Sequence, residues 1–412
     1  MADPRTIVLL GTLDTKGDEV LYIKRLIERR GHRALVVDTG VRGEPAFAAD
    51  VPREQVARAA GSDVAALAAA GDRGQAVAAM LAGAVAVVLS LYERNELDGI
   101  LGLGGGSGTA IGSAAMRALP FGVPKVLVST KAAGDMAPIV GTKDIAVLHS
   151  VTDIMGLNPI LHRVLANAAG AICGMVETEV DVEATEERPA VAITAFGATT
   201  PAAMRCRQLL EERGLTALVF HANGTGGRAM EEMVAQGLLR AVLDLTTTEL
   251  PDELCGGKQS AGPHRLEAAA RRGLPQVVVP GAMDMVNFGP PETVPERYAG
   301  RLFYRHNPNT TLMRTTAAEN AVLGRWVGER VGDARGPAAL LLPRRGFSDY
   351  DRAGGVFFDP AADQAFAEAA IAAVAGRVPV IELDLHINDP AFAAAAVDLL
   401  LRLVAEAQPR GE

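Results

Sequence analysis

The residues best suited to chemistry are the glycines and hydroxyls of the segment L-G-L-G-G-G-S-G-T-A at residues 101–110. The segment follows a short apolar run and leads into small residues with helical spacing, which predicts a turn between a strand and a helix. Glycines let the backbone approach a phosphate closely, and the free N–H groups at a helix start point at an anion. Ser107 and Thr109 could add hydroxyl donors. The sequence therefore predicts a site for a phosphorylated small molecule.

Further polar groups follow the other predicted strands of the first half of the chain. Ligands of open α/β sheets bind beyond the carboxyl ends of the strands, so these groups are expected near the glycine-rich turn. Hydroxyls, a lysine and backbone amides suit phosphate oxygens, and Asp14 could hold Mg²⁺ directly or through water. The candidate cofactor-binding residues are Thr12, Asp14, Lys16, Asp38, Gly104, Gly105, Gly106, Ser107, Gly108, Thr109, Ser129 and Thr130.

Each of these residues also has a structural interpretation. The glycines could simply make tight turns, Lys16 could be a solvated lysine in a first helical turn, and Asp14 could be a helix N-cap. The common nucleotide signatures are absent, because residues 11–17 (G-T-L-D-T-K-G) lack the P-loop order. Ser107 also stands where a dinucleotide motif starting at Gly102 needs its third glycine. A dehydrogenase is therefore the weaker alternative.

The second half of the chain carries a second group of candidates. Residues 221–228 (H-A-N-G-T-G-G-R) combine a glycine-rich turn with a helix start, which predicts a second anion site. Residues 280–314 contain many Pro, Asn and Gly residues without a clear period, and a long irregular loop in a compact domain is usually functional. The residues expected to converge as acid–base and anion-binding groups are His221, Asp284, His306 and Arg314.

A metal site is also conceivable near the end of the chain. Glu382, Asp384 and His386 alternate along the last predicted strand and would share one face. Such residues more often bond neighbouring loops, so the metal interpretation is the weaker of the two.

The elements that position these residues follow an α/β pattern that starts twice. Apolar strands alternate with helices first from residue 6 and again from residue 190, after a polar acidic stretch at residues 177–188. Such strands predict parallel sheets covered on both faces. We therefore expect an α/β fold of two Rossmann-like domains, each a mostly parallel sheet with helices on both faces, over residues 1–185 and 186–412.

Composition excludes several classes of protein. The net charge of −9 argues against non-specific nucleic-acid binding, which depends on lysine and arginine contacts to phosphates. The sequence shows neither a signal peptide nor a continuous run of about 18 apolar residues, so no membrane partner is expected. Cys173, Cys206 and Cys255 are far apart and are expected to be buried thiols, which favours a cytoplasmic location.

The motifs, in their order along nearly the whole chain, resemble the family of the ATP-binding domain of the tomato mosaic virus resistance protein and its bacterial members. The resemblance implies a two-domain Rossmann-like fold, ATP with Mg²⁺ in the first domain, and a homodimer or higher homo-oligomer. It assigns the nucleotide to Thr12, Asp14, Lys16, residues 104–109, Ser129 and Thr130. The motifs that carry it lie at residues 11–17, 104–109, 140–142, 150–153, 221–230, 244–249, 260–263, 280–289 and 306–308.

Three hypotheses for function follow. The first is an enzyme that binds ATP in the first domain and transfers a phosphoryl or adenylyl group to a small anionic metabolite in an inter-domain cleft. The second is a nucleotide-gated binding or regulatory protein without turnover. The third, weaker hypothesis is the dehydrogenase.

Overall fold

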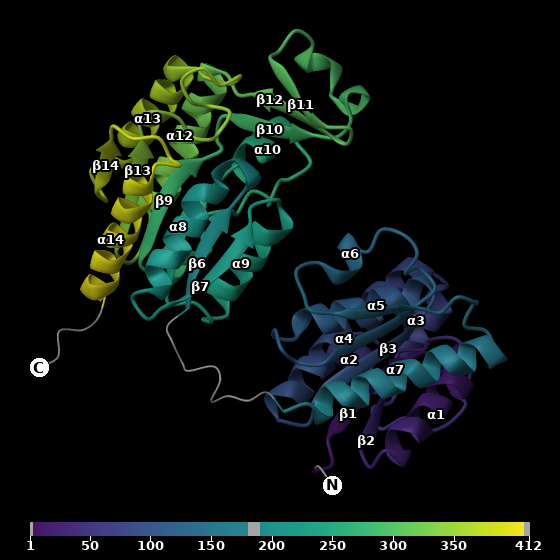
Figure 1. Ribbon diagram of the computed structural model, residues 1–412. Coiled ribbons are helices and arrows are strands. Elements are labelled where there is room, and N and C mark those ends of the chain that lie inside the picture. Colours follow the sequence, from purple (N-terminus) through teal and green to yellow (C-terminus); the bar gives the residue numbers. More distant parts are fainter. Residues whose placement is uncertain (1–2, 180–189, 408–412) are drawn as a thin grey trace, which may run out of the picture. The chain divides into compact units, whose positions relative to one another are not determined.

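The computed structural model describes residues 3–179 and 190–407. The chain divides into two compact units, Met1–Val182 and Glu183–Glu412. The expected boundary between residues 185 and 186 lies outside the described residues. Each unit is built on its own parallel sheet, as the sequence predicted. The two units are described separately below (Figure 1).

The first unit is organised around a five-stranded parallel sheet. Its strands lie in the order β2-β1-β3-β4-β5, so the chain moves outward from β1 to β2 and then crosses to the other side of β1. β1 and β3 are therefore neighbours, and the helices that follow them pack on opposite faces of the sheet. The strands are β1 (Thr6–Gly11), β2 (Arg33–Asp38), β3 (Gly99–Gly104), β4 (Lys125–Ser129) and β5 (Ala146–His149).

Helices cover both faces of this sheet. Successive strand residues point to opposite faces, so Val8 packs with α2, α4 and α5 while Ile7 and Leu9 pack with α1 and α7. Pro159 opens α7 at a position where its missing N–H has no cost, and the side chain of Asn158 caps that helix. The helices are α1 (Leu13–Arg29), α2 (Arg53–Ala59), α3 (Val64–Ala70), α4 (Arg73–Glu93), α5 (Gly106–Ala118), α6 (Ala137–Val140) and α7 (Pro159–Glu177).

Two of these helices, α4 and α7, are long and apolar enough to cross a membrane by length and composition alone. Both supply side chains to the unit's interior: Met80 and Val88 of α4 belong to one core, and Leu165 and Ile172 of α7 to the other. The two helices therefore have a packing role within the α/β unit.

The second unit repeats the architecture with six parallel strands in the order β14-β13-β9-β8-β6-β7. The chain runs from β6 to β7 at one edge and then crosses to β8 on the other side of β6. The strand order therefore reverses between β6 and β8, as it does between β1 and β3, and we call each such place the reversal point of its sheet. The strands are β6 (Ala190–Ala195), β7 (Thr216–His221), β8 (Ala241–Thr246), β9 (Gln276–Gly281), β13 (Ala338–Pro343) and β14 (Val380–Leu383).

The helices of the second unit also lie on both faces. Cys206 of α8 and Phe392 of α14 pack on one face, and Met230 of α9, Leu323 of α12 and Phe366 of α13 pack on the other. The helices are α8 (Thr200–Glu211), α9 (Thr225–Ala235), α10 (Glu249–Cys255), α11 (Ala268–Arg272), α12 (Ala317–Gly332), α13 (Pro360–Val374) and α14 (Pro390–Ala407), with short 3₁₀ turns at Gly197–Thr199, Pro291–Thr293 and Glu296–Tyr298.

The segment expected to be an irregular loop, residues 280–314, is instead partly ordered as a small antiparallel sheet. Strands β10 (Met285–Phe288), β11 (Phe303–Asn307) and β12 (Thr310–Arg314) pair in the order β10-β12-β11. These strands have only four or five residues each, and prolines and glycines separate them, so no periodicity was detectable. The expectation of a loop was wrong, although the segment does carry cavity-lining residues.

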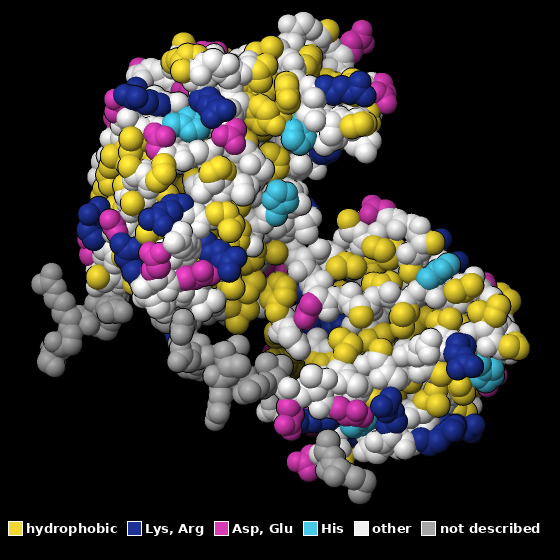
Figure 2. Space-filling view, in the orientation of Figure 1, with side chains coloured by type: hydrophobic (Ala, Val, Ile, Leu, Met, Phe, Trp, Pro, Cys, Tyr) yellow, Lys and Arg dark blue, Asp and Glu magenta, His cyan; other side chains and the backbone are white. Residues whose placement is uncertain are grey.

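Charged side chains are mixed on the molecular face drawn in Figure 2, where lysine and arginine alternate with aspartate and glutamate over both units. The three cysteines are buried and free, as expected for small apolar residues.

Candidate functional site

The first unit has a pocket at the reversal point of its sheet. The pocket has a volume of about 270 Å³ and collects residues that follow the carboxyl ends of β1, β2 and β3. Open α/β sheets bind their ligands at this position, because neighbouring strand-end loops diverge there and leave a crevice. The polar side chains on its wall are Thr12, Asp14, Thr15, Thr39, Arg42, Asp72, Arg73 and Ser107.

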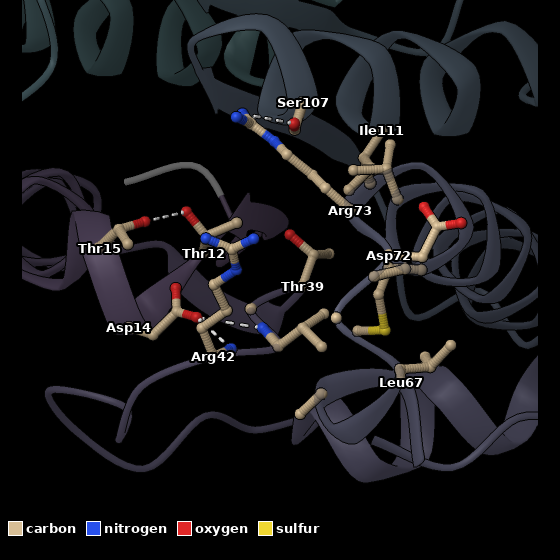
Figure 3. Close-up of a pocket in the computed structure, with 17 residues that line it drawn as sticks. Thr12, Asp14, Thr15, Thr39, Arg42, Leu67, Asp72, Arg73, Ser107 and Ile111 are labelled. Atoms are coloured by element: carbon tan, nitrogen blue, oxygen red, sulfur yellow. Dashed lines mark hydrogen bonds between the residues drawn. The ribbon is translucent and has the colours of Figure 1, made fainter. Parts of the chain in front are cut away.

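Three of the predicted nucleotide residues, Thr12, Asp14 and Ser107, meet in this pocket (Figure 3). The hydroxyls of Thr12 and Thr15 are 2.8 Å apart. Ser107, in the first turn of α5, accepts a hydrogen bond from Nη2 of Arg73 at 3.2 Å. Two threonine hydroxyls on one wall and a cation on the other make the pocket suitable for an anion.

Asp14 lies in the first turn of α1, with Thr12 rather than Asp14 at the N-cap position. Its Oδ2 accepts backbone N–H groups of Val41 at 3.1 Å and Arg42 at 2.9 Å, which fixes the carboxylate at the pocket wall. Among the described residues no cluster of three or more His, Cys, Asp or Glu side chains could hold a metal. Mg²⁺ needs only one or two carboxylates when phosphate oxygens and water complete its shell, so a single Asp14 fits that ion.

The glycine-rich turn divides into two kinds of glycine. A Cβ on Gly104 would lie 2.7 Å from Cα of Gly108, so these two glycines allow β3 and α5 to pack closely. A Cβ on Gly106 would meet only Cε of Lys131, at 3.9 Å, and one on Gly105 only Oγ1 of Thr130, at 3.7 Å. The first turn of α5 has no side-chain cap, so its N–H groups stay available beside Thr130 and Lys131.

The other nine predicted residues do not line the pocket: Gly104, Gly105, Gly106, Gly108, Thr130, Lys16, Asp38, Thr109 and Ser129. The ammonium of Lys16 donates to the carbonyl of Ile154. Asp38 is 2 % exposed and accepts the N–H groups of Leu13 and Gly40. Burial raises the pKa of Asp38, although those hydrogen bonds and Arg53 oppose the shift. Thr109 and Ser129 are buried and bond to each other at 2.7 Å, which ties α5 to the end of β4.

Sequence reasoning missed two cations, Arg42 and Arg73. Figure 3 shows both side chains reaching into the pocket from different segments. Arg42 follows β2, so reading that strand end beyond Asp38 would have found it. Arg73 opens α4, well beyond the end of β2, and only the tertiary structure brings it to Ser107.

The second glycine-rich turn is filled by the protein itself. Oε1 of Glu249 accepts the N–H groups of Gly224 at 2.7 Å and Gly227 at 3.1 Å, so a carboxylate of this chain takes the predicted anion position. The same carboxylate pairs with the fully buried Arg265, which also binds Asp244 through two hydrogen bonds of 2.6 Å. The glycine-rich turn is therefore a structural anchor of α9 and not an open anion site.

The second unit has its own cavity, of about 410 Å³, which contains two of its predicted residues. His221 ends β7, and its ring stacks on Phe196 with 5.5 Å between ring centroids. His306 comes from β11, and its Nδ1 is 2.9 Å from the hydroxyl of Tyr350. The other residues on the wall are Gly197, Ala198, Gln259, Asn287, Asn307, Thr310, Leu312 and Asp349.

Asp284 and Arg314 do not line this cavity. Asp284 is fully buried and accepts the Ser348 hydroxyl at 2.8 Å. Arg314 directs its guanidinium to the carbonyls of Phe357, Asp284 and Asp359, to the Thr315 hydroxyl and to Asp363. All five N–H donors of Arg314 are therefore used inside the protein, and none is left for a ligand.

The buried position of Asp284 predicts a pH effect on stability. Burial, strengthened by the nearby Asp351 and opposed by Arg314, raises the pKa of Asp284 to about 7. Between the unfolded pKa near 4 and this value the folded state holds a proton that the unfolded state has lost. The contribution of Asp284 to the free energy of unfolding therefore falls as the pH rises through this range, by up to about 1.4 kcal/mol per pH unit.

We expect Asp284→Asn to remove this dependence on pH. Between pH 5 and pH 8 the free energy of unfolding of the variant should therefore rise by about 2 kcal/mol relative to that of the wild type. Urea unfolding followed by the fluorescence of Trp326, the single tryptophan of the chain, measures it. Asp384→Asn is the control, because that carboxylate is exposed and pairs with Arg345 at the surface. Parallel pH profiles for Asp284→Asn and the wild type would contradict the prediction.

The three alternating residues near the end of the chain do not converge. Glu382 lies 3.4 Å from Arg344, and Asp384 lies 2.7 Å from Arg345. His386 uses Nε2 at the carbonyl of Ser348 and accepts the Asn388 N–H at Nδ1. These side chains bond neighbouring loops, so the metal interpretation was wrong.

The fold and its pockets define a class: a two-unit, doubly wound α/β protein with a polar pocket at the strand ends of each unit. The chain belongs to the Uncharacterised protein family (UPF0261). Residues 5–181 match the family's N-terminal domain, and residues 188–404 match its C-terminal domain.

Relatives match most of the length of the chain. A UPF0261 protein of Clostridium tetani is 45% identical over 97% of this chain and 99% of its own length. A UPF0261 protein of Rhizobium meliloti is 48% identical over 95% of this chain and 98% of its own length. The ToMV resistance protein Tm-1(GCR237) of Solanum lycopersicum is 38% identical over 80% of this chain but 45% of its own length.

Among solved structures, a UDP-N-acetylglucosamine 2-epimerase from Rickettsia bellii matches 98% of this chain and 96% of its own, with 12% identity and a TM-score of 0.23. A similarity at that level carries no argument about function.

Proposed function

We propose that this protein is an ATP-dependent enzyme whose first unit binds ATP with Mg²⁺ and whose second unit holds a small-molecule substrate. The observation that carries the proposal is the pocket at the reversal point of the first sheet. The uncapped start of α5, the hydroxyls of Thr12 and Ser107, and the guanidinium of Arg73 lie around one crevice. Backbone N–H groups, hydroxyls and arginine are the groups that bind polyphosphates.

Asp14 is the residue that would hold Mg²⁺. Its Oδ2 is fixed by backbone N–H groups, which orients the carboxylate toward the pocket without a second acidic residue. Bound Mg²⁺ would neutralise charge on the phosphates, as in other phosphoryl-transfer enzymes. The dehydrogenase hypothesis is weaker, because Asp38 is buried, is held by Leu13, Gly40 and Arg53, and does not line the pocket where it would meet a ribose.

The second unit supplies the groups for acid–base chemistry. His221 and His306 share the cavity wall, and the Tyr350 hydroxyl holds the His306 ring through Nδ1. A histidine held in this way is suited to accept the proton of a reacting hydroxyl during transfer. The homodimer and the cytoplasmic location stay predictions.

The test is ATP consumption by the purified protein in the presence of Mg²⁺ and a panel of sugar acids, hydroxy acids and polyols. Release of ADP or AMP that depends on one panel member is the expected result. We expect His306→Ala to lower this rate at least about 100-fold and to leave the ATP affinity unchanged, because His306 and the ATP pocket belong to different units. Loss of ATP affinity in this variant would show that the two sites are wrongly divided.

Stabilisation by ATP without any turnover would instead favour the nucleotide-gated binding protein, because a ligand of the native state raises stability by RT ln(1 + [L]/Kd). Stabilisation by NAD alone would favour the dehydrogenase.

A further inference from the structure

The cavity of the second unit has a wall chemistry that restricts its ligand. We infer that it binds a small uncharged molecule with several hydroxyl groups, of the size of a pentitol or hexitol, and that the side-chain oxygens of Asn287 and Gln259 accept its hydroxyl protons. This inference names the class of substrate for the enzyme proposed above. It rests on that proposed function only in taking the second unit as the substrate-binding unit. A volume of about 410 Å³ lies in the range of small-molecule sites.

Asn287 gives the first part of the argument. The residue is completely buried and belongs to the cavity wall. Its Nδ2 donates to Oδ2 of Asp252 at 2.7 Å, and its main-chain N–H donates to Oδ1 of the same carboxylate at 2.8 Å. Because the Asp252 carboxyl group accepts both the main-chain N–H and the amide nitrogen of Asn287, it orients the amide with its oxygen away from Asp252. Asp252 is therefore the positioning residue for the Asn287 oxygen.

That oxygen, Oδ1 of Asn287, has no hydrogen-bond donor among the described residues. Oε1 of Gln259 on the same wall is also buried, and no donor for it is found in the described part of the chain. A buried acceptor without a donor costs about 1–3 kcal/mol, so such groups in a native structure are usually satisfied by a ligand or by water. Two of them at one cavity favour a ligand that brings several O–H or N–H donors.

The charge of the wall indicates that this ligand is neutral. Neither lysine nor arginine lines the cavity in the described residues, and the acidic Asp349 does. Arg314 was expected to bind an anionic ligand, but its N–H groups donate to acceptors inside the protein. A carboxylate or phosphate would lose its hydration without gaining a permanent cation, and that desolvation is expensive.

Flat aromatic rings complete the wall. Phe196 and His221 stack at an interplanar angle of 14°, and Tyr350 holds His306 from another side. The C–H groups of a polyol can pack on these rings while its hydroxyls reach the amide oxygens. Nε2 of His306 makes no hydrogen bond to any described residue, so it can serve one further hydroxyl.

The experiment compares alcohols with the matching acids on the full-length chain, without nucleotide. Xylitol, ribitol and D-glucitol are paired with D-xylonate, D-ribonate and D-gluconate, which differ only by a carboxylate in place of one CH₂OH group. Thermal shift and calorimetric titration at about 10 mM ligand measure binding. We expect at least one polyol to bind, and its acid to bind at least about tenfold more weakly.

Gln259→Leu is the test variant, because it removes one acceptor and keeps the side-chain size. We expect it to weaken polyol binding about tenfold, while Gln208→Leu, the same change on the exposed surface of α8, leaves binding as in the wild type. A general osmolyte effect would act on both variants equally, and that outcome would overturn the inference. So would the absence of any polyol binding, or tighter binding of the acids.

Stabilisation by ATP–Mg²⁺ is measured in parallel. If ATP–Mg²⁺ stabilises the wild type while no polyol binds it, the inference falls and the proposed nucleotide site stands. If ATP–Mg²⁺ does not stabilise the protein while a polyol binds, the inference stands and the proposed nucleotide site falls.

Discussion

Replacing Gly106 by valine should abolish stabilisation by ATP–Mg²⁺ and leave the free protein folded. A Cβ at this position meets no atom closer than Cε of Lys131 at 3.9 Å, so the new side chain has room in the free protein. Valine is also a better helix former than glycine, which offsets any loss in the first turn of α5. The side chain would, however, stand in front of the N–H groups that are proposed to bind phosphate.

The loss of the proposed N–H hydrogen bonds to phosphate predicts a Kd for ATP at least about 100-fold weaker. Differential scanning calorimetry with and without ATP–Mg²⁺ measures the effect as the lost shift in melting temperature. Gly174→Val is the matched control, since that glycine lies in α7 of the same unit with no atom within 4 Å of a new Cβ. An ATP shift in Gly106→Val equal to that of the wild type would refute the phosphate site at α5.

Replacing Arg265 by methionine should destabilise the second unit by about 3–5 kcal/mol. Arg265 is fully buried and pairs with Asp244 and Glu249, whose side chains are almost inaccessible, and with Glu231 at 3.2 Å. Without the guanidinium these carboxylates stay buried with no cation, and the free energy of that burial is unfavourable. The expected loss is a large part of a typical stability of about 5–15 kcal/mol.

Trp326 lies in α12 of the second unit, so its fluorescence during urea unfolding reports this unit directly. Arg213→Met provides the control, because Arg213 pairs with Asp398 at an exposed site where an ion pair contributes less than about 1 kcal/mol. A shift for Arg265→Met no larger than that of the control would mean that the buried network contributes little.

The sequence predicted most of the parallel strands because buried strands of such sheets are continuous apolar runs. The apolar runs at residues 6–10, 125–129 and 190–195 each predict such a strand, and they lie inside β1, β4 and β6. It missed α7, α12 and α13, and it took β10, β11 and β12 for an irregular loop. In these segments small residues, prolines or short lengths obscure the periodicity, and packing against the rest of the unit decides the structure.

The sequence also predicted part of each candidate site. Position after a strand placed Thr12, Asp14 and Ser107 at one pocket, and His221 with His306 at another. The same rule failed for Lys16, Asp38 and Arg314, because it says nothing about which internal partner a polar side chain will find. Internal partners hold all three in the folded protein.

The amino-acid sequence alone determined the α/β class, the repeated architecture and the strand ends at which polar residues gather, since these depend on local apolar patterns and chain order. Only the tertiary structure decided which of those residues face a pocket. That choice depends on contacts between distant segments: Arg73 reaches Ser107 across 34 positions, and Glu249 fills the turn at Gly224 from 25 positions away. A carboxylate or guanidinium binds whichever opposite group folding brings within reach, and the order of residues does not reveal that group.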